Sequence, residues 1–217
     1  LPEMKKYATV IIANVGGESF DDYILALDKL NDTDVDIIEL NISCPNIKNG
    51  GIAFGTKSDI AYEIVKEARN VCTKPLAVKL SPNAENIVDV AGKCEKAGAD
   101  GLSIVNTFKG LAVDIEKRKP VFNNIFAGLS GKAIKPLALA YVYEVSKAVE
   151  IPVIGIGGIT SYIDALEFIM AGAQAVQVGS ANFIKPDICL DIINGLRMFM
   201  EVEGIKDINE IKGIIGR

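Results

Sequence analysis

The chain has 217 residues, of which 49% are hydrophobic and 24% are charged, a balance typical of a folded domain with a sizeable core. Its 23 lysine and arginine residues are outnumbered by 28 aspartate and glutamate residues, and the formal charge of −5 argues against nucleic acid as a partner. The absence of histidine excludes catalytic triads and imidazole metal ligands, so acid–base chemistry falls to Cys, Lys, Asp, Glu or Tyr.

Six apolar runs rich in β-forming residues alternate with segments of helical period. The runs are residues 9–15, 36–42, 75–81, 101–106, 152–157 and 175–180, and the helical segments are 18–31, 57–72, 84–97, 133–149, 161–171 and 188–202. Because the runs show little alternation, they are typical of strands buried on both faces of a parallel sheet with helices outside it. Gly98 and Gly172 are predicted to end two of the helices. The sequence thus predicts one α/β domain over residues 1–217.

Two parallel α/β folds fit this pattern. A (β/α)8 barrel takes about 250 residues and closes with eight strands, whereas an open doubly wound sheet can stop at six. Composition and period do not decide between them. The first residue is Leu1 rather than Met. It therefore stays open that the two strands that a barrel would lack belong to a segment before residue 1.

Two connectors are long enough for function to be expected in them, namely residues 43–56 and 107–132. Loops longer than about 12 to 15 residues are uncommon unless they are functional. Both connectors follow the carboxyl ends of predicted strands, where ligands bind in parallel α/β folds of either kind. Chemistry is therefore expected at this edge of the sheet.

Cys44 lies in a polar loop, whereas Cys72, Cys94 and Cys189 lie within or at the end of predicted helices. The plain interpretation of Cys44 is a small buried thiol, and the alternative is a general base whose loop brings the thiol pKa toward working pH. There is no CxxC pair, no secretory leader and no apolar run of the roughly 18 residues that a membrane span needs. We therefore expect a cytoplasmic protein without a metal site or a membrane partner.

Polar side chains stand out at the ends of several predicted strands. Lys79 is a charge inside an apolar run, so it either faces a site that holds a compensating anion or reaches solvent at the strand end. Asn14, Asn41 and Asn106 end three different strands, and Thr107 follows the last of them. One such asparagine is ordinary turn chemistry, but a convergent set would suit a planar ligand with several oxygens.

Glycine-rich turns end the fifth and sixth predicted strands, at residues 155–160 and 178–180. Glycine lets backbone N–H groups approach an anion closely, and the start of a following helix favours negative charge. Two such turns in succession match the phosphate site that is common in barrels.

Seven motifs stand in order along the chain. They are NISCPN (41–46), GGIAFGT (50–56), VKLSPN (78–83), VNT (105–107), GLSGKAIKP (128–136), GIGGI (155–159) and VGSANF (178–183). Together they resemble the dihydroorotate dehydrogenase family from about residue 10 to residue 200, and most closely its NAD-linked class 1B catalytic subunits. The resemblance implies an FMN-containing (β/α)8 barrel, of which this chain would hold about six βα units and lack the first two strands.

The resemblance also implies roles for individual residues. Cys44 would remove the C5 proton of dihydroorotate while a hydride passes from C6 to FMN, and Lys79 would stabilise negative charge on the flavin. The residues expected against orotate are Asn41, Asn46, Asn106 and Thr107. Those expected against FMN are Asn14, Asn41, Lys79, Val105, Gly131, Gly157, Gly158, Gly179 and Ser180.

The implied function is the oxidation of dihydroorotate to orotate in pyrimidine biosynthesis. Class 1B resemblance further implies a partner subunit that carries FAD and a 2Fe-2S cluster and passes electrons to NAD⁺, with a homodimer of catalytic subunits inside a heterotetramer. The four cysteines lack the clustered spacing of such a site, which assigns the cluster to the partner. Two alternatives stay open: a related FMN barrel such as a dihydropyrimidine dehydrogenase domain, and a flavin-free, non-catalytic fragment.

Overall fold

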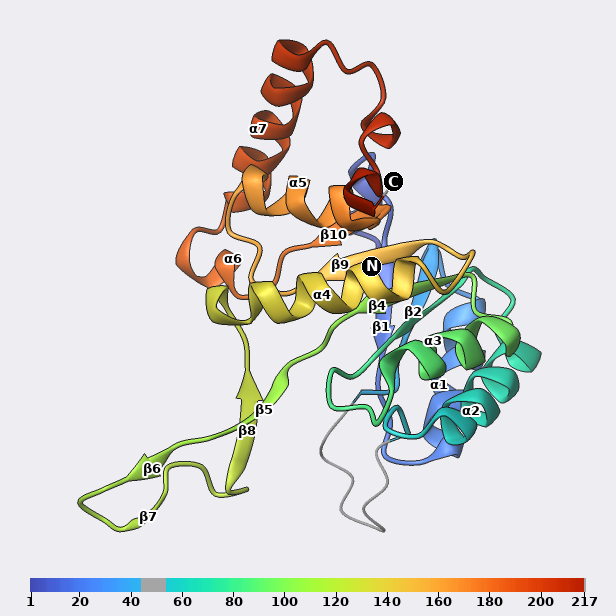
Figure 1. Cartoon of the computed structure of the whole chain (residues 1–217). Coiled ribbons are helices and arrows are strands. Elements are labelled where there is room, and N and C mark those ends of the chain that lie inside the picture. Colours follow the sequence, from blue (N-terminus) through green and yellow to red (C-terminus); the bar gives the residue numbers. More distant parts are fainter. Residues whose placement is uncertain (44–53, 217) are drawn as a thin grey trace.

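A six-stranded parallel sheet forms the centre of the computed structural model, which describes residues 1–43 and 54–216 (Figure 1). Its strands are β1 (Ile12–Val15), β2 (Ile37–Asn41), β3 (Leu76–Lys79), β4 (Gly101–Ile104), β9 (Val153–Ile156) and β10 (Ala175–Gln177). Each strand lies within one of the six apolar runs, so the prediction of a parallel α/β sheet is confirmed.

The strand order is β1-β2-β3-β4-β9-β10, which follows the chain without reversal. A doubly wound sheet reverses its order at a switch point, so this alternative is excluded. Successive helices also contact one another, from α1 through α5 to α7, as they do when all of them cover the same side of a sheet. The layout is therefore singly wound, which is consistent with a barrel.

The described residues form seven helices, of which α7 packs against α5. They are α1 (Phe20–Asn31), α2 (Ser58–Val71), α3 (Ile87–Lys96), α4 (Lys135–Ser146), α5 (Tyr162–Ala171), α6 (Ala181–Ile184) and α7 (Ile188–Glu203). Short 3-10 turns occupy Met4–Lys6, Lys132–Ile134, Ile208–Glu210 and Ile214–Gly216. None of the helices seen in residues 1–43 and 54–216 is long and apolar enough to cross a membrane.

Local signals explain where the helices begin and end. The side chains of Ser19, Asn86 and Ser161 accept hydrogen bonds from backbone N–H groups in the first turns of α1, α3 and α5. Gly98 and Gly172 have φ angles of +101° and +123°, a conformation that favours glycine, and they end α3 and α5 as predicted.

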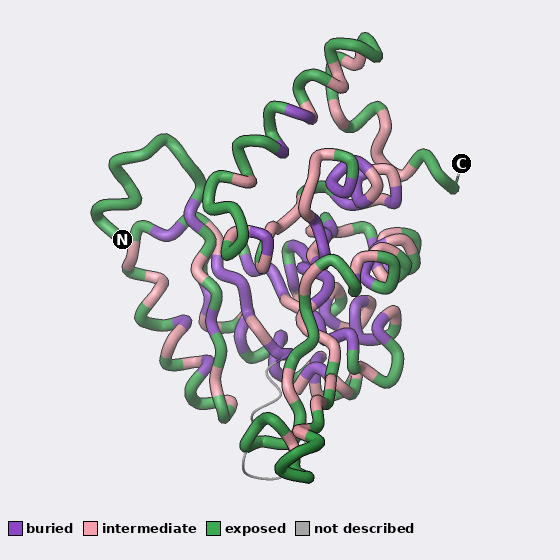
Figure 2. The backbone as a smooth tube through the Cα atoms, turned by 90° about the vertical axis from the view of Figure 1, so that its left-hand side faces the viewer, coloured by how far each residue is buried: buried purple, intermediate pink, exposed green. Residues whose placement is uncertain are grey.

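The sheet has one apolar and one polar face. Ile38 and Leu40 are fully buried in the hydrophobic core, and alternation along β2 turns Glu39 and Asn41 to the opposite face. Figure 2 shows the buried residues gathered along the central strands. Most residues of β2, β3 and β4 are buried, as expected for strands covered on both faces, but the buried residues of the inner face include the polar side chains of Glu39 and Ser103.

Side-chain contacts show how strongly the sheet curls. Gln177 on β10 donates a hydrogen bond of 2.8 Å to Glu39 on β2, four strands away in the sheet order. Four steps along a flat sheet amount to about 19 Å, far beyond the combined reach of two such side chains. The sheet must therefore curve so that β10 faces β2 across the interior.

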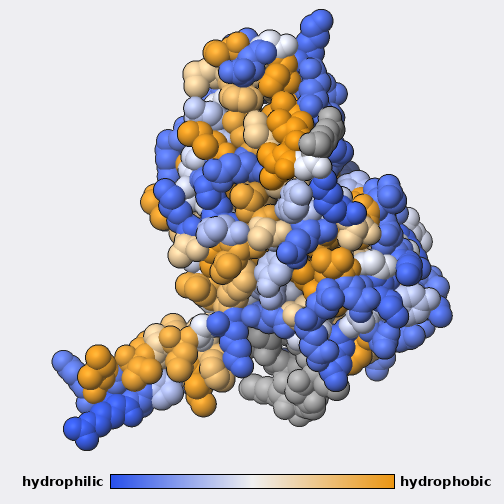
Figure 3. Space-filling model, viewed as in Figure 1, coloured by the Kyte–Doolittle hydropathy of each residue, from blue (hydrophilic) through white to orange (hydrophobic). Residues whose placement is uncertain are grey.

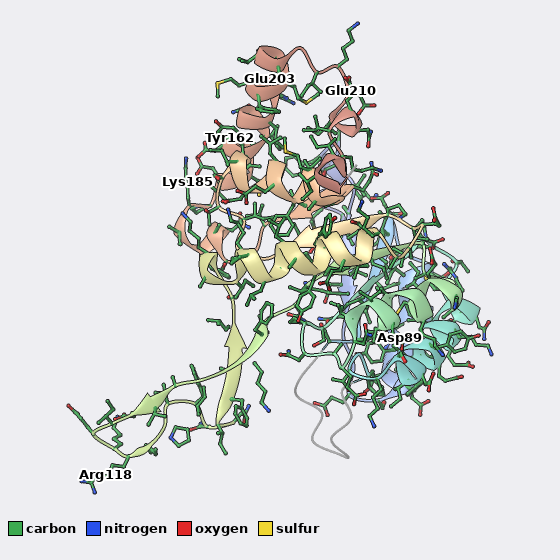
Figure 4. All side chains as sticks on the ribbon, viewed as in Figure 1. Asp89, Arg118, Tyr162, Lys185, Glu203 and Glu210 are labelled. Atoms are coloured by element: carbon green, nitrogen blue, oxygen red, sulfur yellow. The ribbon has the colours of Figure 1, made fainter. Side chains whose placement is uncertain are left out.

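Residues 108–129 form an arm that projects from the body of the molecule (Figures 1 and 4). Its strands pair as two antiparallel ladders, β5 (Phe108–Leu111) with β8 (Phe126–Leu129) and β6 (Val113–Asp114) with β7 (Lys119–Pro120). Figure 4 shows Arg118 at the tip of the arm, remote from Tyr162 at the start of α5, and Figure 3 shows apolar side chains exposed along the arm. The predicted long connector is thus a structured element.

The core gives the first testable prediction. Phe168 of α5 is fully buried against the sheet, so Phe168→Ala should lower the free energy of unfolding by about 3–5 kcal/mol through lost burial and a residual cavity. Leu25→Ala on α1, where the side chain is 55% exposed, should cost about 0.5 kcal/mol or less. Urea denaturation of both variants measures the difference, and equal losses would contradict the assigned core.

Candidate functional site

Glu39 is the centre of a hydrogen-bond network on the inner face of the sheet. Its side chain is only 3% exposed. Asn14 on β1 donates to its Oε1 at 2.5 Å, and Ser103 on β4 donates to its Oε2 at 2.5 Å. With Gln177 of β10 also donating to Oε2, this carboxylate joins strands from both edges of the sheet. A buried carboxylate needs such donors because burial otherwise disfavours its charge.

Lys79 ends β3 beside this carboxylate. Its side chain is 18% exposed, and its Nζ lies 3.8 Å from Oε1 of Glu39. The sequence predicted a compensating anion near Lys79, and the described chain itself supplies one in Glu39, a residue that the sequence analysis did not single out. The signal was present, because Glu39 is also a charge inside an apolar run. The alternative of a lysine that merely reaches solvent does not fit this burial.

The three strand-end asparagines lie together. Asn41 donates from Nδ2 to Oδ1 of Asn14 at 3.5 Å, and Asn106 donates to Oδ1 of Asn41 at 3.4 Å. Ser43, which is 5% exposed, donates to the same Oδ1 at 2.5 Å and accepts from Asn106. Strand register explains the convergence, because Asn14 pairs with Glu39 and Asn41 with Lys79 on adjacent parallel strands.

A cavity of about 250 Å³, which we call the glycine cavity, opens at the carboxyl ends of the strands. It brings together most of the residues that the resemblance assigned to a cofactor, and it adds apolar side chains to them. Its lining consists of Lys79, Val105, Asn106, Thr107, Ser130, Gly131, Ile134, Ile156, Gly157, Gly158, Ile159, Gly179, Ser180 and Phe183. Asn14 and Asn41 are not in this lining, but Asn41 is joined to it by the hydrogen bond from Asn106, and Asn14 is joined to Asn41.

Two glycines of this cavity, Gly157 and Gly158, are required by close packing. Gly157 and Gly158 have φ angles of +135° and +73°. A Cβ on Gly157 would lie 2.6 Å from Cβ of Ala138, and one on Gly158 would lie 2.8 Å from Cβ of Lys135 and 3.0 Å from the carbonyl oxygen of Gly131. The turn after β9 therefore passes against the start of α4, with no side chain between its backbone and the cavity. Such backbone is suited to a phosphate group.

Asp164 carries a second buried carboxylate behind these turns. Its side chain accepts hydrogen bonds from Lys135 Nζ at 2.7 Å, and from the backbone N–H and hydroxyl of Thr160 at 2.9 Å each. Burial by itself raises the pKa of Asp164, but the bonds from Lys135, Thr160 and Ser161 outweigh it and hold the pKa well below its usual value. The carboxylate is therefore charged in the folded protein at neutral pH.

A larger cavity of about 740 Å³ lies between the strand ends and the arm, and we call it the arm cavity. Ser43, Ser81 and Asn83 line it from the body, and Phe108 and Phe122 line it from the arm. Asn83 fixes this boundary by donating to the Thr107 carbonyl at 3.1 Å and accepting from the Lys109 N–H at 3.1 Å.

Thr107 is common to the two cavities, which are therefore neighbours. The sequence analysis missed Ser43, Ser81 and Asn83, although all three lie in or beside the motifs at 41–46 and 78–83. A side-by-side pair of sites, one rich in glycine and one rich in hydroxyl and amide groups, can hold a phosphate-bearing cofactor next to a small polar substrate.

Cys44 and Asn46 lie outside the described residues. The chain is described up to Ser43, which lines the arm cavity, and again from Phe54. The other cysteines line neither cavity: Cys72 and Cys94 are buried, and Cys189 is exposed on α7. Burial raises the pKa of the Cys94 thiol to about 12, so Cys94 is not poised as a base.

Comparison with known proteins identifies the family. A family model of dihydroorotate dehydrogenase matches residues 1–200. The chain belongs to the dihydroorotate dehydrogenase family. The catalytic subunit of dihydroorotate dehydrogenase B (NAD(+)) from Petrotoga mobilis is 61% identical over 215 residues, which cover 99% of this chain and 72% of the relative. The corresponding subunit from Alkaliphilus metalliredigens is 49% identical, over 98% of this chain and 70% of the relative.

A solved structure supports the fold. The crystal structure of DHODH in complex with ferulenol from Eimeria tenella superposes with a TM-score of 0.74 at 22% identity. The match covers 94% of this chain and 59% of that one, so the present chain corresponds to part of a longer fold. At this identity the likeness speaks for the α/β architecture shared within the family.

Gly158 tests the packing of the glycine cavity. Gly158→Ala should lower the free energy of unfolding by about 1–3 kcal/mol, because its φ is positive and the added Cβ meets backbone and Lys135. Gly92→Ala is the matched control: it lies within α3 with nothing within 4 Å of the new Cβ and should stabilise the protein by about 0.4–1 kcal/mol. Chemical denaturation would contradict the packing if the two changes had the same sign.

Asp164 predicts a pH dependence of stability. Its pKa is depressed in the folded state, so its contribution is present above the unfolded value of about 3.9 and is lost as the pH falls toward the folded value. Asp164→Asn should therefore cost about 2 kcal/mol at neutral pH, and the deficit should shrink below about pH 4.

The control for this prediction is Asp59→Asn, since Asp59 pairs with Lys93 but is 88% exposed. That change should alter stability far less at either pH, because solvent screens an exposed ion pair. Urea midpoints at neutral and acidic pH compare the variants with the wild type. A deficit of Asp164→Asn that stays constant with pH would show that the charge of Asp164 is not what stabilises the turn.

Proposed function

We propose that this chain catalyses the oxidation of dihydroorotate to orotate in pyrimidine biosynthesis, as the catalytic subunit of an NAD-linked dihydroorotate dehydrogenase. Membership of the family supports this assignment, and so do the relatives, which are dihydroorotate dehydrogenase B (NAD(+)) catalytic subunits. The main structural support is that the glycine cavity and the arm cavity share Thr107. Lys79 lines the glycine cavity, and Ser43 lines the arm cavity. This arrangement suits a cofactor beside a small, planar, oxygen-rich substrate.

FMN is the cofactor that the glycine cavity fits. The backbones of Gly131, Gly157, Gly158, Gly179 and Ser180 would hold its phosphate end, since all five line the cavity and four of them have no side chain to keep a phosphate group away from the backbone N–H groups. Val105 and Lys79, which also line this cavity, would lie against the ring. When bound, FMN supplies the acceptor for the hydride from C6 of dihydroorotate.

The residues of the chain supply binding and proton chemistry. The ammonium group of Lys79 would favour negative charge on the ring. Glu39 would keep that ammonium group in place and offset part of its positive charge. Asn41, Asn106 and Thr107 would bind the pyrimidine oxygens and N–H groups. Asn46 would join them from outside the described residues. Cys44, which directly follows the cavity residue Ser43 in the sequence, would take the C5 proton.

The finer architecture is a (β/α)8 barrel. Its support is the singly wound strand order and the contact between Gln177 and Glu39 across the interior. The six described strands would account for six of the eight units, with further strands between β10 and β1 closing the ring.

Further subunits complete the proposal. A partner with FAD and a 2Fe-2S cluster would carry electrons to NAD⁺, in agreement with the term catalytic subunit in the names of the relatives. Two catalytic subunits would form a homodimer within a heterotetramer, and the assembly would work in the cytoplasm.

Cys44 tests the proposed chemistry. In the purified full-length protein loaded with FMN, dihydroorotate should bleach the flavin absorbance under anaerobic conditions. Cys44→Ser should slow this bleaching by about 100-fold or more while FMN binding stays close to that of the wild type, because only the base is weakened. Stopped-flow absorbance measures the rate.

The matched control is Cys189→Ser, a change at an exposed cysteine on α7 that should leave the rate unchanged. If dihydroorotate fails to reduce the flavin of the wild type, the proposed function is wrong. If Cys44→Ser reacts at the wild-type rate, the function stands but Cys44 is not the base.

A further inference from the structure

The two oxygens of the buried Asp164 carboxylate contact two different elements. Oδ2 accepts from the backbone N–H and the hydroxyl of Thr160 and from the hydroxyl of Ser161, each at 2.9 Å. These residues end the turn that begins with Gly157 and Gly158. Oδ1 accepts from Nζ of Lys135 at 2.7 Å. One side chain in the first turn of α5 thus connects the turn after β9 to the start of α4.

Lys135 completes this connection from the other side. It begins α4 directly after the 3-10 turn Lys132–Ile134, which follows Gly131. Its Nζ also lies 2.7 Å from Oε2 of Glu167, one turn further along α5. The side chain of Lys135 is 22% exposed and that of Asp164 is 6% exposed, so most of this ion pair is shielded from solvent.

The ion pair lies where the turn at Gly131 contacts the turn at Gly157 and Gly158. A Cβ on Gly158 would be 2.8 Å from Cβ of Lys135 and 3.0 Å from the carbonyl oxygen of Gly131. Gly131 and Gly158 both line the glycine cavity, whereas Lys135 and Asp164 do not. A change in the ion pair would therefore affect a bound ligand only by moving the turns that contain Gly131 and Gly158.

Lys135 is poorly suited to bind an anion directly. Two carboxylates, Asp164 and Glu167, each lie 2.7 Å from its ammonium group, and their charges together exceed its own. The hydrogen bonds that Lys135 donates to these carboxylates raise its pKa, with the bond to Asp164 contributing most. The ammonium group is thus occupied by the protein and does not face the cavity.

We propose that the Lys135–Asp164 ion pair is a positioning element. It sets the distance between the turn at Gly131 and the turn at Gly157 and Gly158, so that their backbone N–H groups fit the phosphate group of the cofactor. The inference rests on the proposed function only in naming FMN as the phosphate-bearing ligand. Backbone N–H groups bind an anion well only at a defined spacing, so holding the turns in advance of binding raises the affinity for the phosphate end. The ring end, near Lys79 and Val105, does not depend on this pair.

The test compares FMN with riboflavin, which has the same ring but no phosphate. In the full-length protein, Asp164→Asn and Lys135→Met should each weaken FMN binding by about tenfold or more, since each removes a hydrogen bond between charged groups that orders the turns. Binding of riboflavin should stay within about twofold of the wild type for both variants. Quenching of flavin fluorescence measures both dissociation constants.

Glu167→Gln is the matched control. It removes the other carboxylate from Lys135, and Glu167 is 40% exposed, whereas the hydrogen bonds of Thr160 go to Asp164. FMN binding by this variant should stay within about twofold of the wild type. The double variant Asp164→Asn/Lys135→Met should lose no more FMN affinity than the weaker-binding single variant, because each change breaks the same Lys135–Asp164 contact.

Several outcomes would overturn the proposal. FMN affinity at the wild-type level in both single variants would show that the turns hold their spacing without the pair. Equal losses for FMN and riboflavin, additive losses in the double variant, or failure of both single variants to fold would assign the pair to general stability. These outcomes are separate from the test with dihydroorotate, which concerns the wild type and can fail while the FMN and riboflavin comparison succeeds.

Discussion

The buried carboxylate of Glu39 is the group on which the inner face of the sheet depends. An ionised carboxylate is costly in the interior unless donors and a counter-charge surround it. Here the donors come from β1, β4 and β10, and the nearby ammonium group comes from β3. Strands from both edges of the sheet approach one another at this single charge. The curl of the sheet, the burial of Lys79 and the position of Asn14 together allow it to be satisfied.

A second buried carboxylate, that of Asp164, joins elements beside the glycine cavity, as Glu39 joins strands on the inner face of the sheet. Asp164 ties the turn after β9 to the start of α4, so the glycine cavity is bordered by elements held through charged hydrogen bonds. Thr107 is shared by the glycine cavity and the arm cavity. A cofactor phosphate, a flavin ring and a pyrimidine would thus each meet a different part of one rigid frame.

The sequence predicted the elements whose signals are local. Apolar runs marked all six parallel strands, and Gly98 and Gly172 marked helix ends because their positive φ angles favour glycine. The partner of Lys79 could not be predicted from local pattern, since Glu39 lies 40 residues away and meets it only in the folded sheet. The arm strands were also missed, because they are short, interrupted by glycine or proline, and stabilised by pairing with one another.

The most direct test of the central claim is a crystal structure of the full-length protein with FMN and orotate bound. The account predicts the phosphate at the backbone N–H groups of the glycine turns. It also predicts the ring beside Lys79 with Glu39 still at its ammonium group, and orotate on the far side of Thr107 in the arm cavity. A flavin bound elsewhere, or a Lys79 that has left Glu39 and turned away from the ring, would contradict it.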